Sequence, residues 1–290
     1  MRSTRGMKAR LTVTAVAAAV VAGGGLATTV TTAAPAEAAT GSIRVITHNV
    51  AKKPEALQKV LALADSAKSP GPEVVFLQEV CQSMLKQLDG KGPREFHIRR
   101  TNQGDCSDGV IGEVVMLNQR GAKGQGNSVT LLEEPDKGQS YGLACLNFTY
   151  RKKSTRACST HLPSGREADR AALRLTMTRA IKDKARLWNA QNPVLVGGDF
   201  NSLPTDREMA QMYALGTKAR GDFVELNQTA GTGNEARAGL FTIGRVKKNT
   251  DRKYDYVFSW AAKTARQGGS VKTQFTPSNH RMMYGAFPLR

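Results

Sequence analysis

The sequence predicts an α/β fold in one domain, and two observations lead to this expectation. Apolar and polar residues alternate over 42–50, a helical apolar pattern covers 54–64, and a β-branched apolar run follows over 73–80. The second observation is that several predicted strands end on a carboxylate, an amide or an imidazole. Polar groups at the ends of strands are typical of ligand sites at the edge of a sheet.

The first 39 residues are predicted to be a secretory signal peptide. Four bases come before Leu11, an Ala/Val/Gly-rich run covers 11–26, and Ala36-Glu37-Ala38 has the small-residue pattern of a cleavage site. The run is short for a membrane anchor because Gly23-Gly24-Gly25 and several threonines interrupt it. We therefore expect an exported protein starting at residue 40, with no transmembrane segment.

The formal net charge is +18 over 290 residues. Such a surface attracts polyanions, with nucleic acid as the first candidate and anionic lipid headgroups or cell-wall polymers as others. The alternative is that the charge serves only to keep the protein soluble.

Four cysteines in an exported chain suggest two disulfides. Predicted strands over 141–150 and 155–161, joined through a turn at Arg151-Lys152, place Cys145 directly opposite Cys158. Cys81 is then left for Cys106. No Cys-x-x-Cys spacing supports the competing interpretation, a zinc site.

The first half of the expected domain continues from the opening strand, helix and strand. The strand over 73–80 brings Gln78 and Glu79 to its C-terminal end. A short helix is expected over 81–88. Further strands are expected over 96–100, 111–118 and 128–132, with a Gly-rich turn over 121–126.

The longest helix is expected over 166–190. Its core stripe is predicted to contain Leu173, Met177, Ile181, Lys184 and Trp188, and its outward face Arg170, Arg174, Arg179 and Lys182. Beyond the central strand we expect a helix over 206–215, a loop over 219–253, a strand over 254–260 that carries Asp255, and a last strand over 282–287. The sequence has no internal repeat and no linker composition, so we expect one domain over 40–290.

The central strand ends in the segment VLVGGDFNSLP, residues 194–204. Alternation along a strand points Asp199 and Asn201 the same way, so one carboxylate and one amide converge on a single ligand atom or phosphate. The alternative is that Asp199 or Asn201 caps a helix starting near Thr205.

Six short motifs together resemble the endonuclease/exonuclease/phosphatase superfamily, whose members share the deoxyribonuclease I-like fold. They are HNV around Asn49, LQEV around Glu79, STHL around His161, GDFNSLP around Asp199 and Asn201, YDYVF around Asp255, and SNH around His280. They occur in the family's order and span residue 42 to the C-terminus. Together, LQEV and GDFN are specific.

The resemblance implies a four-layered α/β sandwich of two packed mixed sheets, and hydrolysis of phosphoric esters with a divalent metal, Mg²⁺ or alternatively Mn²⁺ or Ca²⁺. It implies that Glu79 is the principal metal ligand with Asn49 beside it. It also implies that Asn201 orients the phosphate and that Asp199 aligns or deprotonates the attacking water. His161 and His280 would flank the phosphorus, and Asp255 would fix the tautomer of His280.

The chain departs from the family pattern at its last motif, which is commonly Ser-Asp-His. Asn279 stands at the position of that aspartate, which puts its role as a metal ligand in doubt. The nuclease branch also has a carboxylate partner for His161, for which Glu113 and Asp108 are both candidates.

The expected function is that of a secreted metal-dependent phosphodiesterase, most of all an endonuclease acting on nucleic acid as a monomer. The alternatives are a phospholipid or sphingolipid phosphodiesterase, a phosphatase, or a non-catalytic polyanion-binding protein. GDFNSLP lacks the Asn-Tyr-Arg ending of inositol polyphosphate phosphatases, and Leu162-Pro163 stands where bacterial sphingomyelinases tend to place a Gln. The bases expected near the active edge are Arg99, Arg100, Arg151, Lys152, Lys153, Arg166, Arg170, Lys247, Lys248 and Arg252.

Overall fold

Twelve strands in the described part of the chain form two six-stranded sheets. The computed structural model describes residues 41–66, 71–101, 106–133, 138–189, 192–216, 218–229, 233–244, 252–261 and 271–288. In order across the first sheet, its strands are β11 (Lys272–Phe275), β12 (Arg281–Pro288), β1 (Ser42–Asn49), β2 (Glu73–Cys81), β4 (Val110–Asn118) and β3 (Arg94–Thr101). Across the second sheet they are β5 (Lys123–Leu131), β6 (Gly142–Tyr150), β7 (Lys153–His161), β8 (Val194–Asp199), β10 (Asp255–Trp260) and β9 (Phe223–Glu225). The predicted signal peptide lies outside the described residues.

Each sheet contains one parallel pair, and a helix makes the crossover between its two strands. Helix α1 (Pro54–Ser66) connects the parallel strands β1 and β2, and helix α2 (Ala168–Trp188) connects β7 and β8. The other strand pairs are antiparallel, so both sheets are mixed. A parallel connection needs such a crossover, because a tight turn cannot return the chain to the same end of the sheet.

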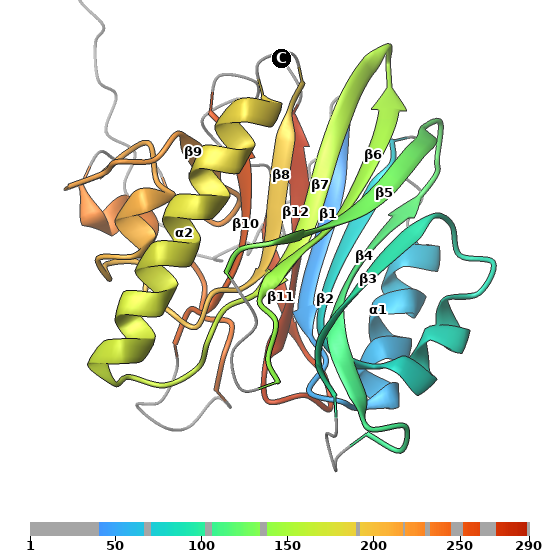
Figure 1. Ribbon diagram of the computed structural model, residues 1–290. Coiled ribbons are helices and arrows are strands. Elements are labelled where there is room, and N and C mark those ends of the chain that lie inside the picture. The colour runs from blue at the N-terminus through green and yellow to red at the C-terminus, as the bar shows by residue number, and fades with distance from the viewer. Residues whose placement is uncertain are drawn as a thin grey trace, which may run out of the picture. The chain divides into compact units, whose positions relative to one another are not determined.

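Three apolar clusters show how the layers pack. The first joins α1 to the outer face of the first sheet, with Leu57 against Ile46. The second fills the space between the sheets, with Val45 and Leu195 among its members. The third joins the second sheet to α2 through residues such as Met177. The helices therefore cover opposite outer faces of the paired sheets (Figure 1), which confirms the expected four-layered sandwich.

The two-residue period of a strand places the polar strand ends between the sheets. Val45 faces the second sheet, and Asn49 shares its alternation on β1. The same alternation relates Leu195 to Asp199, and Ala157 to His161. The side chains predicted to be catalytic thus project from the inner faces at one edge of the sandwich.

The sheets approach each other closely just below this edge. A Cβ atom on Gly197 would lie 2.4 Å from Cγ of the Phe76 ring on the facing sheet. Glycine is therefore required at this position of β8, two residues before Asp199.

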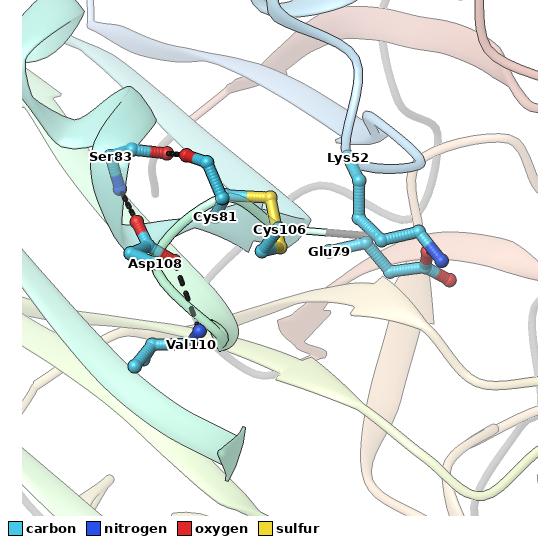
Figure 2. The surroundings of a disulfide bond; sticks show 8 residues. Lys52, Glu79, Cys81, Ser83, Cys106, Asp108 and Val110 are labelled. Carbon is cyan, nitrogen blue, oxygen red and sulfur yellow. Dashed lines mark hydrogen bonds and ion pairs between the residues drawn. A yellow bond between two sulfur atoms is a disulfide. The ribbon is translucent and has the colours of Figure 1, made fainter. Parts of the chain in front are cut away.

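Both disulfides join the pairs that were expected. Cys145 and Cys158 are directly paired across β6 and β7, and the turn residues Arg151 and Lys152 have φ angles of 50° and 63°. Two consecutive positive φ angles are typical of the type I′ hairpin turn. The second disulfide, Cys81–Cys106, ties the end of β2 to the loop before β4 (Figure 2).

Several predicted element bounds need correction. No helix covers 206–215; turns and a short 3₁₀ helix, η2 (Met209–Gln211), occupy this segment. The side chain of Asp206 accepts a bond from the backbone N of Leu203 at 2.7 Å, which favours a turn over a continued helix. β5 begins at Lys123, inside the predicted Gly-rich turn, because the long strand β6 pairs with it through a bulge at 124–126. The segment 81–88, predicted as a short helix, forms the 3₁₀ helix η1 (Gln82–Leu88). The segment 219–253, predicted as a loop, contains the 3₁₀ helix η3 (Asn234–Arg237).

The outward face predicted for the long helix was wrong at one residue. Arg174 is buried, and its guanidinium donates to Oε1 of Glu208 at 3.0 Å and to the carbonyl oxygens of Pro163 and Gly165. Helical periodicity identifies the face of α2 that packs on the sheet. Only the tertiary structure shows that a loop also packs against another side of this helix. None of the described helices is long and apolar enough to span a membrane.

Candidate active site

The amide of Asn49 connects two carboxylates at the edge of the sandwich. Its Nδ2 donates to Oε1 of Glu79 at 3.1 Å and to Oδ2 of Asp199 at 3.0 Å. Its Oδ1 accepts a bond from the backbone N of Ala51 at 3.0 Å, which fixes the orientation of the amide. Asn49 therefore presents donors, and not its carbonyl oxygen, to Glu79, so in this arrangement it positions the carboxylate that was expected to bind metal.

A β-bulge turns Glu79 toward the site. Leu77 packs toward α1, and regular alternation would point Glu79 the same way. The pairing of β2 with β4 shifts between Leu77 and Val80, and Glu79 has a φ of 54°. Bulges re-aim side chains next to sites in this manner. Lys52 holds the bulge through a bond from its backbone N to the Glu79 carbonyl at 3.0 Å.

Asp199 and Asn201 form a local turn at the end of β8. Oδ1 of Asp199 accepts a bond from the backbone N of Asn201 at 2.9 Å, and Asn201 has a φ of 50°. The Asn201 amide donates to the Leu162 carbonyl at 3.0 Å and lies 3.1 Å from Nε2 of His161. No helix starts near Thr205 in the described chain, so the capping alternative is excluded.

His161 is held as a neutral imidazole. Because the Asn201 amide donates to Nε2, the ring proton lies on Nδ1, which is 3.7 Å from Oε1 of Glu113. Burial, followed by the charges of Arg99 and His280, holds the pKa of His161 well below its usual value. Arg99 donates its Nε to the same Glu113 oxygen at 3.1 Å.

The structure selects Glu113 over Asp108 as the carboxylate beside His161. Asp108 accepts bonds from the backbone N atoms of Ser83 and Val110, next to the Cys81–Cys106 disulfide (Figure 2). These bonds occupy the Asp108 carboxylate in its own loop.

His280 forms the second histidine pair. Its Nδ1 donates to Oδ2 of Asp255 at 2.9 Å, and its Nε2 lies 3.7 Å from Oδ2 of Asp199. Burial alone would lower the pKa of His280, but the charges of Asp255 and Asp199 outweigh it and raise the pKa to about 9. His280 is therefore an imidazolium at neutral pH, between two carboxylates.

Burial raises the pKa of Asp199, and the charge of His280 opposes this rise. The chain that precedes His280 is tied to β1, because Oγ of Ser278 donates to the Asn49 carbonyl at 2.7 Å and accepts from the backbone N of His280 at 3.0 Å. Oγ1 of Thr242 accepts bonds from the backbone N atoms of Tyr254 and Asp255, both at 3.0 Å. These hydroxyls fix the backbone at His280 and at Asp255, and with it the Asp255–His280 pair.

Two groups of side chains fit a divalent cation. The Glu79 carboxylate is partly exposed, and its Oε2 lies 3.8 Å from the Lys52 ammonium, too far for a hydrogen bond. Such an available carboxylate oxygen suits a hard cation that keeps several waters. Ligand atoms of Asp199, Asp255 and His280 also lie within 4.8 Å of one another, and Oδ1 of Asp255 is buried with no hydrogen-bond partner. His280 is an imidazolium, and a cation that coordinates its ring would have to displace a proton, so Glu79 is the better fit.

Asn279 stands apart from these groups. It is exposed between the buried residues Ser278 and His280, and it makes no hydrogen bond or ion pair within the described residues.

Sequence reasoning missed His97 and misplaced several bases. His97 pairs with Glu113 across β3 and β4, and its Nδ1 lies 3.4 Å from Oε2 of Glu113. Only the register of β3 on β4 shows this contact.

Arg151, Lys152 and Lys153 lie at the opposite end of β7 from His161, because the strand separates the hairpin turn from the catalytic edge. Lys247 and Lys248 lie outside the described residues.

The sequence matches the model of the endonuclease/exonuclease/phosphatase family over residues 46–280. A humanized D. rerio TDP2 with 14 mutations has a similar structure, with a TM-score of 0.61, 16% identity, and coverage of 85% of this chain and 98% of that chain. The human Nocturnin catalytic domain with bound sulfate gives a TM-score of 0.61 and 16% identity, with coverage of 86% and 95%. An endonuclease/exonuclease/phosphatase from Beutenbergia cavernae has a TM-score of 0.62 and 17% identity, with coverage of 86% of this chain and 72% of that chain. The comparison with curated protein sequences gave no match.

Proposed function

Because this chain belongs to the endonuclease/exonuclease/phosphatase family, a family of metal-dependent phosphoric ester hydrolases, we propose that it is a secreted phosphodiesterase that cleaves nucleic acid. The observation that carries the proposal is that the Asn49 amide joins Glu79 to Asp199, while Nε2 of His161 and Nε2 of His280 lie 3.5 and 3.7 Å from the same Asp199 oxygen. Such a cluster has the acid, base and cation-binding groups that phosphoryl transfer needs.

Glu79 would hold the divalent cation, with Mg²⁺ as the expected ion. The cation supplies positive charge that neutralises the oxygens of the phosphate and of the leaving group. The Asn49 amide keeps Glu79 and Asp199 at a fixed separation, because it donates to both.

Asp199 would align the attacking water and accept its proton. A buried carboxylate whose pKa is raised toward neutrality is a suitable base. Nε2 of His280 lies only 3.7 Å from Oδ2 of Asp199. We therefore assign the His280 imidazolium to binding a phosphoryl oxygen through its Nε2 proton, and Asp255 to stabilising the charge and the orientation of that ring.

Asn201 would bind the phosphate by turning toward it the amide N–H that donates to Nε2 of His161, and the Nε2 exposed in this way could accept a proton. The Asn201 amide is oriented by the Leu162 carbonyl, and the His161 ring by the Asn201 amide and Glu113. The bond to the Leu162 carbonyl keeps the Asn201 amide in place while its other N–H turns to the substrate, which limits the reorganisation that the reaction requires.

Nucleic acid is the proposed substrate because of the charge of the chain. A formal net charge of +18 favours a polyanionic partner. A D. rerio TDP2 of the same fold, with a TM-score of 0.57 and 16% identity, was solved in complex with a single-strand DNA product. Export through a leader over residues 1–39, with one domain over 40–290, is supported by the two disulfides, which persist in oxidising compartments.

A lipid phosphodiester is the second candidate, and an apolar surface favours it. Leu240 and Phe241 are exposed at 43% and 49%, on the segment whose Thr242 carbonyl accepts a bond from the backbone N of Arg281. Exposed apolar side chains next to His280 would suit contact with a membrane surface.

The test uses the full-length gene in a secreting host, with the product recovered from the medium. N-terminal sequencing should begin near residue 40. Supercoiled plasmid should be nicked with Mg²⁺, and nicking should vanish with chelator and in the His161→Ala and Asp199→Asn variants. A folded protein that leaves plasmid and RNA intact but cleaves sphingomyelin or phosphatidylinositol vesicles would establish the lipid alternative. No hydrolysis of either, with retention by nucleic acid, would indicate the binding protein.

A further inference from the structure

A hollow of about 550 Å³ lies beside the chain that leaves the catalytic edge. Its walls come from the segment 205–211, from residues 218 and 220, and from η3. Arg207, Lys218, Arg220 and Arg237 are its four cationic lining residues, and Asp206 is its only carboxylate among the described lining residues.

The charges in this hollow are unbalanced. Arg207, Lys218 and Arg220 are exposed, and none makes a side-chain ion pair within the described residues. Nearby cations on α2 behave differently, since Arg174 pairs with Glu208 at 3.0 Å and Arg186 pairs with Asp222 at 2.7 Å. Three unpaired cations in one concave surface repel one another, and an anionic ligand would relieve this repulsion.

The carboxylate and the buried arginine are already engaged. Oδ2 of Asp206 accepts from the backbone N of Leu203 at 2.7 Å. The guanidinium of Arg237 donates to the Leu215 carbonyl at 3.0 and 2.9 Å and stacks over the Tyr213 ring at 4.6 Å. The buried Arg237 therefore gives the hollow a fixed positive charge. The exposed side chains of Arg207, Lys218 and Arg220 are available to a ligand.

The hollow is connected to the site through a short, anchored segment. The Cα atoms of Asn201 and Asp206 are at most about 18 Å apart, since they are five residues apart along the chain. Oγ of Ser202 donates to Glu208 at 2.9 Å, and the Tyr256 hydroxyl donates to the Ser202 carbonyl at 2.7 Å. A polymeric substrate bound at Asn201 would thus reach the hollow.

We propose that this basic hollow binds a backbone phosphodiester of the nucleic acid to one side of the bond that is cleaved. The inference rests on the proposed function and adds a subsite to it. The volume falls in the range of about 300 to 1,000 Å³ of small-ligand pockets, so the hollow accommodates one nucleotide. Arginine is suited to the task because its planar donors match phosphate oxygens.

The test measures binding of a fluorescent single-stranded oligonucleotide to the full chain at several salt concentrations, with chelator present to prevent cleavage. Arg207→Ala and Arg220→Ala should weaken binding, and their double variant more so. Each lost phosphate contact should reduce the slope of log affinity against log salt by roughly 0.7. Lys152→Asn is the matched control: it removes one exposed cation at the other end of β7 and should leave the slope unchanged.

Hydrolysis of bis(p-nitrophenyl) phosphate separates this inference from the proposed function. The small diester cannot reach the hollow while it is cleaved, so the hollow variants should hydrolyse it like the wild type. Wild-type protein that fails to hydrolyse it would contradict the proposed function, and the binding comparison would still decide the subsite. The inference is overturned if the hollow variants and Lys152→Asn lose equal affinity, or if the variants lose binding only to anionic lipid vesicles.

Discussion

The ammonium of Lys52 lies 3.8 Å from Oε2 of Glu79, the carboxylate that best fits the divalent cation. The adjacent Lys53 instead donates its ammonium to the Pro277 carbonyl at 2.8 Å. Of these two neighbouring lysines, only Lys52 therefore has its ammonium close to the Glu79 carboxylate.

Lys52→Gln should tighten Mg²⁺ binding by about threefold to tenfold, because a positive charge close to the cation is removed. Calorimetric titration of Mg²⁺ into the substrate-free protein measures this directly. Lys53→Gln removes the same formal charge and should change the affinity less. Equal effects of the two variants would mean that the Lys52–Glu79 contact has no specific influence.

Asn279→Asp should strengthen Mg²⁺ binding by less than tenfold. The substitution adds a negative charge beside His280, but residue 279 is exposed and its charge is screened by solvent. The same titration, repeated at low and high ionic strength, should show the difference shrinking with salt. Identical Mg²⁺ affinities at both salt concentrations would contradict an effect of Asn279 on the cation.

Asp255→Asn should lower the pKa of His280 from about 9, because the Asp255 charge is a main reason that it is raised. The imidazolium that binds the phosphoryl oxygen would then be lost near neutral pH, with kcat reduced by about 100-fold to 1,000-fold. The raised pKa also contributes stability that is fully present below pH 6.5 and lost as the pH rises through about 9. NMR titration of the His280 ring in both proteins measures the shift. An unchanged pKa in the variant would mean that Asp255 does not raise the pKa of His280.

Glu73→Gln should change the pH dependence of stability without affecting the site. Burial raises the pKa of Glu73 to about 7, despite the opposing charge of Arg44 at 3.0 Å. Because the folded pKa is raised, the contribution of Glu73 is fully present below pH 4.5 and is lost as the pH rises through about 7. The variant lacks this loss, so the difference between its free energy of unfolding and that of the wild type should shift in its favour by about 3 kcal/mol across that window. Parallel denaturation curves at all pH values would contradict this.

Removing the Cys81–Cys106 disulfide should weaken Mg²⁺ binding as well as stability. Cys81 follows Glu79 by two residues, and the disulfide closes a 25-residue separation beside the bulge (Figure 2). Its loss in Cys81→Ala/Cys106→Ala should cost about 3 kcal/mol of unfolding free energy. Cys145→Ala/Cys158→Ala is the matched control, since that disulfide joins β6 and β7 on the face toward α2. It should lose comparable stability and keep its Mg²⁺ affinity; equal loss of affinity would disprove a local effect on Glu79.

Much of the site was predictable because strand alternation is a local property. Two-residue periodicity together with the motif order was enough to predict that Asn49, His161, Asp199 and Asp255 come together at one edge of a sandwich. The Cys145–Cys158 pair was predictable for the same reason, because a two-residue turn sets the register of a hairpin.

The tertiary structure decided what depends on contacts between distant segments. The bulge that turns Glu79 inward depends on how β2 pairs with β4, and the choice of Glu113 over Asp108 depends on how the two sheets face each other. Arg174 is buried because a loop and Glu208 close over its helix. Local patterns carry the period and direction of side chains, whereas register between sheets and loop closure are set by packing over the whole domain.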